Sequence, residues 1–231
     1  MRPVGRYHAP VPDALTLYVD AYWLSPWTCT AWVGLREKGV DFGTSVAMFQ
    51  PRVGALEAMR ERTLTGTAPV LQNGSLWIAE SLAIVEYLEE AFPPPAWPRI
   101  LPVELGDRAR ARQVLSWLRT SQEPLRRERP TEHIFYPPPT PLAPLSIAAQ
   151  QAADDLCYAA AGLGASASGC LFGDFGVVDA DLAFALMRLV ATGAKIPPSI
   201  AAYARAVWAR PSVVEFVRHP RPPHPPPPTA D

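Results

Sequence analysis

The chain has 231 residues, of which 48% are hydrophobic and 19% are charged, a composition typical of a globular protein and not of a disordered chain. Its 21 Lys and Arg residues nearly balance 22 Asp and Glu residues, so the overall charge favours neither nucleic acid nor an anionic membrane as a partner. No apolar run reaches the ~18 residues of a membrane-spanning helix, and the first residues lack the apolar segment of a secretory signal. We therefore expect a cytoplasmic protein without membrane association or a nucleic-acid partner.

The first part of the chain, residues 14–92, alternates strand and helix patterns. Strand patterns cover residues 14–19, 41–49 and both arms of a hairpin at 68–79, which turns at Asn73-Gly74. Helix patterns cover residues 26–38, 51–59 and 81–92. This order predicts a parallel crossover followed by an antiparallel hairpin, and hence a small four-stranded mixed sheet with helices on both faces. The predicted fold class of this part is α/β.

The first predicted helix has clear ends. Ser25 stands where an N-cap is expected, Pro26 occupies the first helical position, and Gly39 follows the last turn. Ser25 is therefore predicted to cap the helix at the point where the first strand gives way to it.

Proline marks the joints of the chain, with 28 residues, roughly twice the usual share of about 5%. A cluster at 93–102 predicts an interdomain linker, and another at 137–144 predicts a stiff loop between helices. Residues 103–218 otherwise show only helical patterns, which predict a second, all-α domain. The proline-rich tail at 219–231 is expected to be extended or disordered and not to pack.

Three segments resemble the glutathione S-transferases. They are "SPWTCTAWVGLREKGVDF" from Ser25, "TAPVLQNGSLWIAESLAIVEYLEE" from Thr67 and "FGVVDADLAFALMRL" from Phe175. In addition, "RARARQVLSWLR" with "LRRERPTEHIFY" is similar to a bacterial subgroup whose catalytic position is serine. The resemblance extends from about Leu15 to about Val217. It implies a thioredoxin-like glutathione-binding domain at 14–92, an all-helical C-terminal domain, a homodimer, and glutathione as co-substrate.

The resemblance assigns the segment around Pro69 to the peptide backbone of glutathione. In the thioredoxin-like fold this proline is cis, and Ala68 is expected to pair with the glutathione cysteine like a short added strand. The sequence alone also allows a trans proline on an edge strand. Thr67 stands where many relatives carry Lys, Arg or Gln near the glycyl carboxylate. That carboxylate then needs another partner, for which Gln50, Arg52 and Arg62 are the candidates.

The resemblance assigns Glu80 and Ser81 to the γ-glutamyl end of glutathione. Ser81 begins a predicted helix, where a hydroxyl and free N–H groups favour a carboxylate. Glu80 is expected to take the amine. An ordinary helix start, with Ser81 as cap, is the alternative.

Ser25 stands where thioredoxin-like redox proteins carry the first cysteine of their C-x-x-C motif. Because the window from Ser25 to Thr28 has no cysteine, the sulfur must come from bound glutathione. The resemblance implies that the Ser25 hydroxyl donates a hydrogen bond to that sulfur and favours the thiolate. Cys29 and the phenols of Tyr18 and Tyr22 are the alternatives, although Cys29 has the apolar neighbours of a packing residue.

The cysteine and histidine positions suggest neither a disulfide framework nor a metal site, because the three cysteines are far apart and no metal-ligand spacing occurs.

Seven arginines between 108 and 129 predict the solvated face of a long helix that partly lines the cleft. Gly176 replaces the Ser or Thr of the capping box that Asp179 completes in the second domain. Trp27, Trp117 and residues 133–136 are candidates for the second-substrate surface.

These expectations lead to one functional hypothesis and two rivals. The hypothesis is a glutathione S-transferase that transfers glutathione thiolate to an electrophile, with possible peroxidase or disulfide-reductase activity on a peroxide or mixed disulfide. One rival is a protein of the same fold that binds glutathione or a hydrophobic ligand without turnover. The other is an interaction scaffold.

Overall fold

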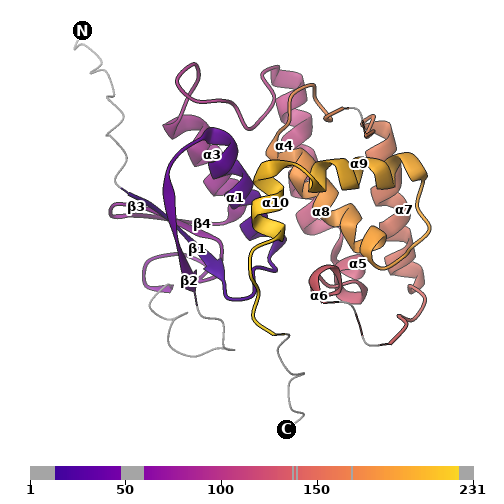
Figure 1. The fold of residues 1–231 in the computed structure, drawn as a ribbon. Helices are drawn as coiled ribbons and strands as arrows, with labels where there is room; N and C mark the ends of the chain where they lie inside the picture. The colour runs from indigo at the N-terminus through magenta and orange to yellow at the C-terminus, as the bar shows by residue number, and fades with distance from the viewer. Residues whose placement is uncertain (1–13, 48–59, 137, 139, 168, 224–231) are drawn as a thin grey trace.

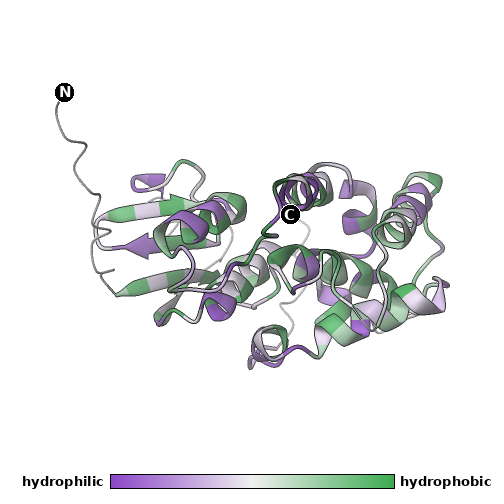
Figure 2. Ribbon diagram, turned by 90° about the horizontal axis from the view of Figure 1, so that it is seen from above, coloured by the Kyte–Doolittle hydropathy of each residue, from purple (hydrophilic) through white to green (hydrophobic). Residues whose placement is uncertain are grey.

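The computed structural model describes residues 14–47, 60–136, 138, 140–167 and 169–223. The predicted helix at 51–59 and the candidate ligands Gln50 and Arg52 lie outside these residues. Within them, a sheet domain and a helical domain lie side by side, as Figure 1 and the view from above in Figure 2 show. This arrangement confirms the predicted fold class.

The sheet has four strands in the order β2-β1-β3-β4. The strands are β1 (Leu15–Asp20), β2 (Phe42–Ala47), β3 (Val70–Asn73) and β4 (Leu76–Ala79). β1 pairs with β2 in parallel, while β3 pairs antiparallel with both β1 and β4. The mixed sheet and its Asn73-Gly74 hairpin are therefore confirmed.

Two described helices contact this sheet and each other, α1 (Pro26–Lys38) and α3 (Ser81–Ala91). α1 has the predicted bounds because its ends are chemically marked: Ser25 caps it, and Gly39 closes it at φ +66°, a left-handed conformation that glycine adopts without strain. These ends set where the first helix points, and so where Ser25 lies.

The helical domain is built around α8. Its helices are α4 (Leu105–Thr120), α5 (Glu123–Glu128), α6 (Glu132–Phe135), α7 (Ile147–Gly162), α8 (Val177–Ala191), α9 (Pro198–Trp208) and α10 (Pro211–Val217). α8 contacts α4, α7 and α9 within the domain and α1 across the boundary, and α10 also packs on α1 (Figure 1). No helix in the described part of the chain is both long and apolar enough to cross a membrane.

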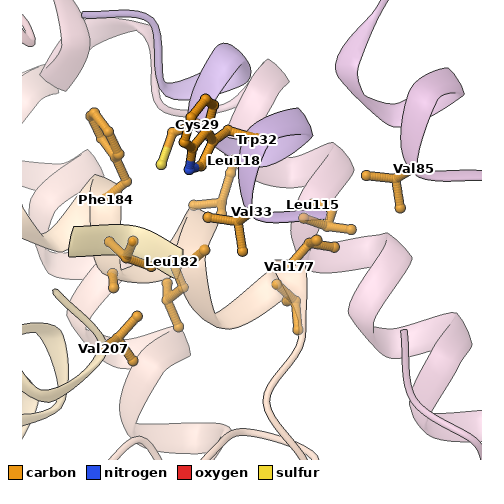
Figure 3. Packing of buried hydrophobic residues seen from close by; sticks show 14 of the residues in the cluster. Cys29, Trp32, Val33, Val85, Leu115, Leu118, Val177, Leu182, Phe184 and Val207 are labelled. Atoms are coloured by element: carbon orange, nitrogen blue, oxygen red, sulfur yellow. The ribbon is translucent and has the colours of Figure 1, made fainter. Parts of the chain in front are cut away.

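One hydrophobic core runs through both domains. Figure 3 shows Cys29 and Val33 of α1 among Leu115 and Leu118 of α4 and Leu182 of α8. All five are buried members of one cluster. Because the cluster crosses the domain boundary, the two domains are held in a fixed relation by hydrophobic burial.

The predicted linker is packed on both domains. Ile100 and Leu101 are buried, and the Ile100 N–H donates to a Glu89 carboxylate oxygen at 2.7 Å. The same carboxylate group pairs with the buried ammonium of Lys38 at 3.0 Å. The linker thus adds a polar anchor to the hydrophobic contact between the domains.

The structure explains why the N-cap of α8, position 176, is a glycine. A Cβ at position 176 would lie 2.8 Å from the carbonyl oxygen of Ile100, which accepts the N–H of Val177. The Gly176 N–H donates to Asp179 Oδ2 at 3.0 Å, so half of the capping box persists. The other carboxylate oxygen of Asp179 accepts from the Tyr203 hydroxyl at 2.8 Å. The absence of a serine hydroxyl therefore reflects close packing against the linker.

The prediction that residues 219–231 do not pack is wrong for their first part. His219 stacks on Trp23, with 3.6 Å between ring centroids. The Arg221 guanidinium donates to the carbonyl oxygen of Trp23 at 2.9 Å and lies 3.7 Å from the ring centroid of Phe135. Charge and aromatic contacts hold this segment in place, and the proline content of the tail does not reveal them.

Truncating the chain after Arg218 should lower its melting temperature by about 2–8 °C. The truncation removes contacts worth ~1–2 kcal/mol, and each kcal/mol shifts the melting temperature by about 2–4 °C in a protein of this size. Truncation after Pro223 is the control, because residues 224–231 contain almost no apolar side chain except proline. Thermal unfolding followed by circular dichroism checks both, and equal melting temperatures would contradict the packing role.

Candidate active site

The loop that carries Ser25 is fixed by the last residue of β1. The two carboxylate oxygens of Asp20 accept the N–H groups of Leu24 at 2.8 Å and Ser25 at 3.1 Å. Asp20 was not among the residues predicted from the sequence. The sequence feature that could have indicated its role is its position between a predicted strand and a predicted helix start. From such a position a carboxylate often closes a turn.

Trp23 fixes the same loop through its backbone and its ring. Its φ of +52° is uncommon for a residue other than glycine, and such a conformation needs support from its surroundings. The buried ring packs edge-on against Trp32 with 5.3 Å between centroids, and the carbonyl group receives the Arg221 guanidinium. The C-terminal segment therefore contacts the loop two residues before Ser25.

Ser25 caps α1, as predicted. Its hydroxyl oxygen accepts the N–H of Thr28 at 3.3 Å, and its backbone is extended at φ −66° and ψ 120°. A hydroxyl that accepts one hydrogen bond still has its own proton to donate. The capping role therefore leaves the hydroxyl able to act as a donor at the helix N-terminus.

Five of the six predicted site residues line one cavity of about 180 Å³. They are Thr67, Ala68, Pro69, Glu80 and Ser81. The Ala68-Pro69 peptide bond is cis, which confirms that prediction. Ser25 is not among the lining residues, but Trp27 of the same helix start is. Two residues of the helical domain, Arg119 and Arg126, complete the cavity.

Glu80 and Ser81 differ in exposure and backbone geometry. Glu80 is exposed and has φ +69°, a conformation that non-glycine residues seldom adopt. Ser81 is only 3% exposed and begins α3, where the first N–H groups lack partners within the helix. An exposed carboxylate thus lies next in the chain to a buried hydroxyl at a helix N-terminus.

Arg119 of α4 links this hydroxyl to the core of the helical domain. Its Nη2 donates to Ser81 Oγ at 2.8 Å, and its Nη1 donates to Asp181 Oδ2 at 2.7 Å. The other oxygen of Asp181 accepts a short hydrogen bond from the Thr30 hydroxyl of α1. Burial raises the pKa of Asp181, and the charge of Arg119 opposes that rise. The network therefore joins α1, α3, α4 and α8 beneath the cavity.

Trp27 lies within cation–π distance of both arginines that line the cavity. The guanidinium carbon of Arg119 lies 4.2 Å from its ring centroid, and that of Arg126 lies 5.9 Å away. The negative face of an indole attracts cations and offsets part of the repulsion between two guanidinium groups. Trp27 is therefore a link between the Ser25 helix and the arginines, and the second-substrate role considered for it is not needed to explain its position.

The alternatives to Ser25 lie elsewhere. Cys29 is 2% exposed, and burial raises the pKa of its thiol well above its usual value, so it carries little thiolate. The Tyr18 hydroxyl donates to Gln72 Oε1 at 2.9 Å, between β1 and β3. Neither residue lines the cavity, and neither does Tyr22.

Among the described candidates for the glycyl carboxylate and the second substrate, only Trp27 lines this cavity. The exposed Arg62 stacks over Trp77 of β4 at 4.9 Å and does not line it. Ile134 and Phe135 line a separate cavity of about 850 Å³ among α6, α8, α9 and α10. Trp117 packs against the core. Size alone does not identify the site, because the larger cavity lacks every predicted glutathione-binding residue.

The smaller cavity is lined by ionisable groups of both charges. A carboxylate is available for an ammonium group, while arginine side chains and a helix start are available for a carboxylate. The described residues contain no group of three or more His, Cys, Asp or Glu side chains that could hold a metal ion.

Comparison with known proteins decides the family. Residues 24–91 match the family described as "Glutathione S-transferase, N-terminal domain", and residues 104–220 match "Glutathione S-transferase, C-terminal domain". The chain belongs to the glutathione S-transferase family. The predicted family is thereby confirmed, and the cavity lies where the matched N-terminal and C-terminal segments meet.

Solved structures agree with this assignment. A glutathione transferase homologue from Burkholderia BGR1, solved with bound glutathione, is 35% identical, has a TM-score of 0.73, and covers 89% of this chain and 97% of its own. A Tau class glutathione S-transferase from mango has a TM-score of 0.68 over 88% of this chain and 92% of its own; at 22% identity it shows the fold alone.

Curated relatives match a shorter part of the chain. Glutathione S-transferase U13 from Arabidopsis thaliana is 36% identical over 100 residues, which are 42% of either chain. Glutathione S-transferase 1 from Dianthus caryophyllus is 36% identical over 94 residues, 40% of this chain and 41% of its own. The match therefore spans about two-fifths of the length of these relatives.

Proposed function

We propose that the chain is a glutathione transferase that binds glutathione at the 180 Å³ cavity and transfers its sulfur to an electrophile. The observation that carries the proposal is the convergence of Thr67, Ala68, Pro69, Glu80 and Ser81 on one cavity at the domain boundary. Membership of the family and the glutathione bound to the Burkholderia homologue support the same ligand. The serine-type subgroup remains part of the proposal.

Each lining residue has a distinct task in this proposal. Ala68, before the cis Pro69, offers its backbone to the cysteine of glutathione, like one residue of an added strand. Glu80 takes the γ-glutamyl ammonium group, and Ser81 at the start of α3 takes the carboxylate. Thr67 lies beside the glycyl end and lacks the longer side chain that many relatives carry at this position.

Ser25 stabilises the glutathione thiolate that reacts. Its hydroxyl donates a hydrogen bond to the glutathione sulfur, while the N-terminus of α1 adds a positive potential. Both effects favour loss of the thiol proton to solvent. The thiolate then forms a bond to an electrophilic carbon as the leaving group departs with the electron pair of the broken bond. A peroxide or a mixed disulfide as second substrate, a homodimeric assembly and a cytoplasmic location remain predictions.

Glu80→Ala and Ser81→Ala should each weaken glutathione binding about 5- to 150-fold. The expected loss is ~1–3 kcal/mol, because each variant removes a partner of a charged ligand group. Isothermal titration calorimetry with glutathione measures it. Glu61→Ala is a matched control, since Glu61 is exposed and does not line the cavity.

Calorimetry and an electrophile panel together test the proposed function. Binding with turnover by the unaltered protein is the expected result. Binding without turnover on any electrophile would favour a glutathione-binding protein that is not an enzyme. Unchanged affinity in both site variants would show that glutathione does not bind in this cavity.

A further inference from the structure

Among the described residues, Arg126 has no ion-pair partner. It is half-buried in α5 and lines the cavity, and its Nη1 donates to the carbonyl oxygen of Leu118 at 2.8 Å. Within the described part of the chain, no carboxylate lies within ion-pair distance of its guanidinium group. Glu123, on the same short helix, pairs instead with Arg127 at 2.5 Å. Arg126 therefore faces the cavity as a cation.

Arg119 is in a different electrostatic state. Its guanidinium is held between Asp181 and Ser81 Oγ, so a buried carboxylate already balances its charge. Burial lowers the pKa of Arg126, and the charge of Arg119 adds to this effect, while Glu123 opposes it. Arginine stays protonated despite such shifts, so the cost of its charge is relieved when an anion enters the cavity.

The carboxylate of Glu80 indicates which kind of anionic ligand group the cavity and Arg126 would bind. Glu80, on the domain opposite Arg126, has no ion-pair partner among the described residues. Within the described residues, the cavity thus combines one cation and one carboxylate that lack ion-pair partners, and Ser81 at the start of α3 lines it as well. A ligand group with an ammonium and a carboxylate on one carbon matches this pair of charges. The γ-glutamyl end of glutathione is such a zwitterion.

We propose that Arg126 binds the α-carboxylate of the γ-glutamyl group, and that the helical domain thereby supplies half of the charge recognition of glutathione. This inference rests on the proposed function. Arg119 acts as a positioning residue, because its bond to Ser81 orients the hydroxyl that shares the same carboxylate. The planar guanidinium of Arg126 suits a carboxylate better than an ammonium point charge would.

The assignment gives Trp27 a role in recognition. Its ring lies within cation–π distance of both guanidinium groups, which favours Arg126 at the cavity although Arg119 repels it. Glutathione would thus be held by residues of α1, α3 and α5 at once. The carboxylate subsite is complete only when the sheet and helical domains are docked.

The test combines an arginine variant with an altered ligand. Calorimetry would compare the full-length protein with Arg126→Gln and Arg126→Lys, using glutathione, glutathione with its γ-glutamyl α-carboxylate converted to a carboxamide, and γ-glutamylcysteine. We expect Arg126→Gln to weaken glutathione binding about 10- to 150-fold, the range for hydrogen bonds to charged groups. Arg126→Lys should lose less, because it keeps the charge.

The altered ligands locate the contact. The carboxamide should bind the unaltered protein about as weakly as glutathione binds Arg126→Gln, and the variant should weaken its binding little further. γ-Glutamylcysteine should show the full loss in the variant. Arg110→Gln is the control, because it removes an exposed arginine of α4 away from the cavity and should change affinity less than about twofold.

Other outcomes would overturn the assignment. An equal loss for glutathione and its carboxamide, or a loss that disappears with γ-glutamylcysteine, would place Arg126 at another part of the ligand. Tight glutathione binding that is unchanged in Arg126→Gln would contradict this inference alone. Absence of glutathione binding by the unaltered protein would reject both the proposed function and the inference.

Discussion

Ser25→Ala should raise the pKa of the thiol of bound glutathione and lower kcat near neutral pH by about 10- to 1000-fold. This range corresponds to ~1.4–4 kcal/mol, the usual effect of removing one donor from a developing or localised charge. Part of the lost rate should return at high pH, because the thiol then ionises without the hydroxyl. Ultraviolet absorbance of the thiolate against pH, measured alongside kcat, tests both statements.

A capping role alone predicts a different result. Ser25 accepts the N–H of Thr28, and loss of such a cap costs about 1 kcal/mol of stability with little change in rate per folded molecule. Ser146→Ala is a matched control, because Ser146 caps α7 through the N–H of Ala149 in the helical domain. If the ionisation curve of bound glutathione does not move in Ser25→Ala, Ser25 is only a cap.

Arg119→Met should lower the free energy of unfolding by about 3–5 kcal/mol. The variant leaves the carboxylate of Asp181, 2% exposed, without its cation in the core, and breaking a buried ion pair on one side carries a cost of this order. The loss should shrink as the pH falls toward the raised pKa of Asp181, because the protonated side chain carries no charge. Urea denaturation at several pH values measures both effects.

Two further variants test whether the stability loss of Arg119→Met comes from the unpaired buried charge of Asp181. Arg112→Met, also in α4, removes a bidentate ion pair with Glu86 of α3, but both side chains are about 40% exposed, so the expected loss is under about 1 kcal/mol. The double variant Arg119→Met/Asp181→Leu should recover much of the lost stability, because neither buried charge then remains. A loss of less than about 1 kcal/mol in Arg119→Met alone would contradict a structural role for this pair.

The sheet domain could be predicted from its sequence because local signals set its elements. Ser25, Pro26 and Gly39 mark the ends of α1, and Asn73-Gly74 marks the hairpin. Turn and cap preferences arise within a few residues, so they can be recognised without the rest of the chain. The same holds for the positions of Pro69, Glu80 and Ser81, although their assignment to glutathione came from family resemblance.

The arginines of the site could not be assigned individually from the sequence. Seven arginines between 108 and 129 look alike in the chain, and the prediction that they partly line the cleft does not say which ones do so. The helix phase and the packing of α4 against α8 and of α5 against α7 place only Arg119 and Arg126 of these seven in the cavity. Asp181 gave no signal either, because its partners Thr30 and Arg119 are 151 and 62 residues away along the chain.

The order of elements, the helix caps and the hairpin follow from the sequence, since each depends on neighbouring residues. Tertiary structure alone decided that Arg119 is neutralised by Asp181 while Arg126 remains a free cation among the described residues. It also decided that Arg221 supports the loop of Ser25 in spite of its proline-rich surroundings. The physical reason is that charge compensation depends on distances of a few ångströms, and these are fixed only when distant helices pack.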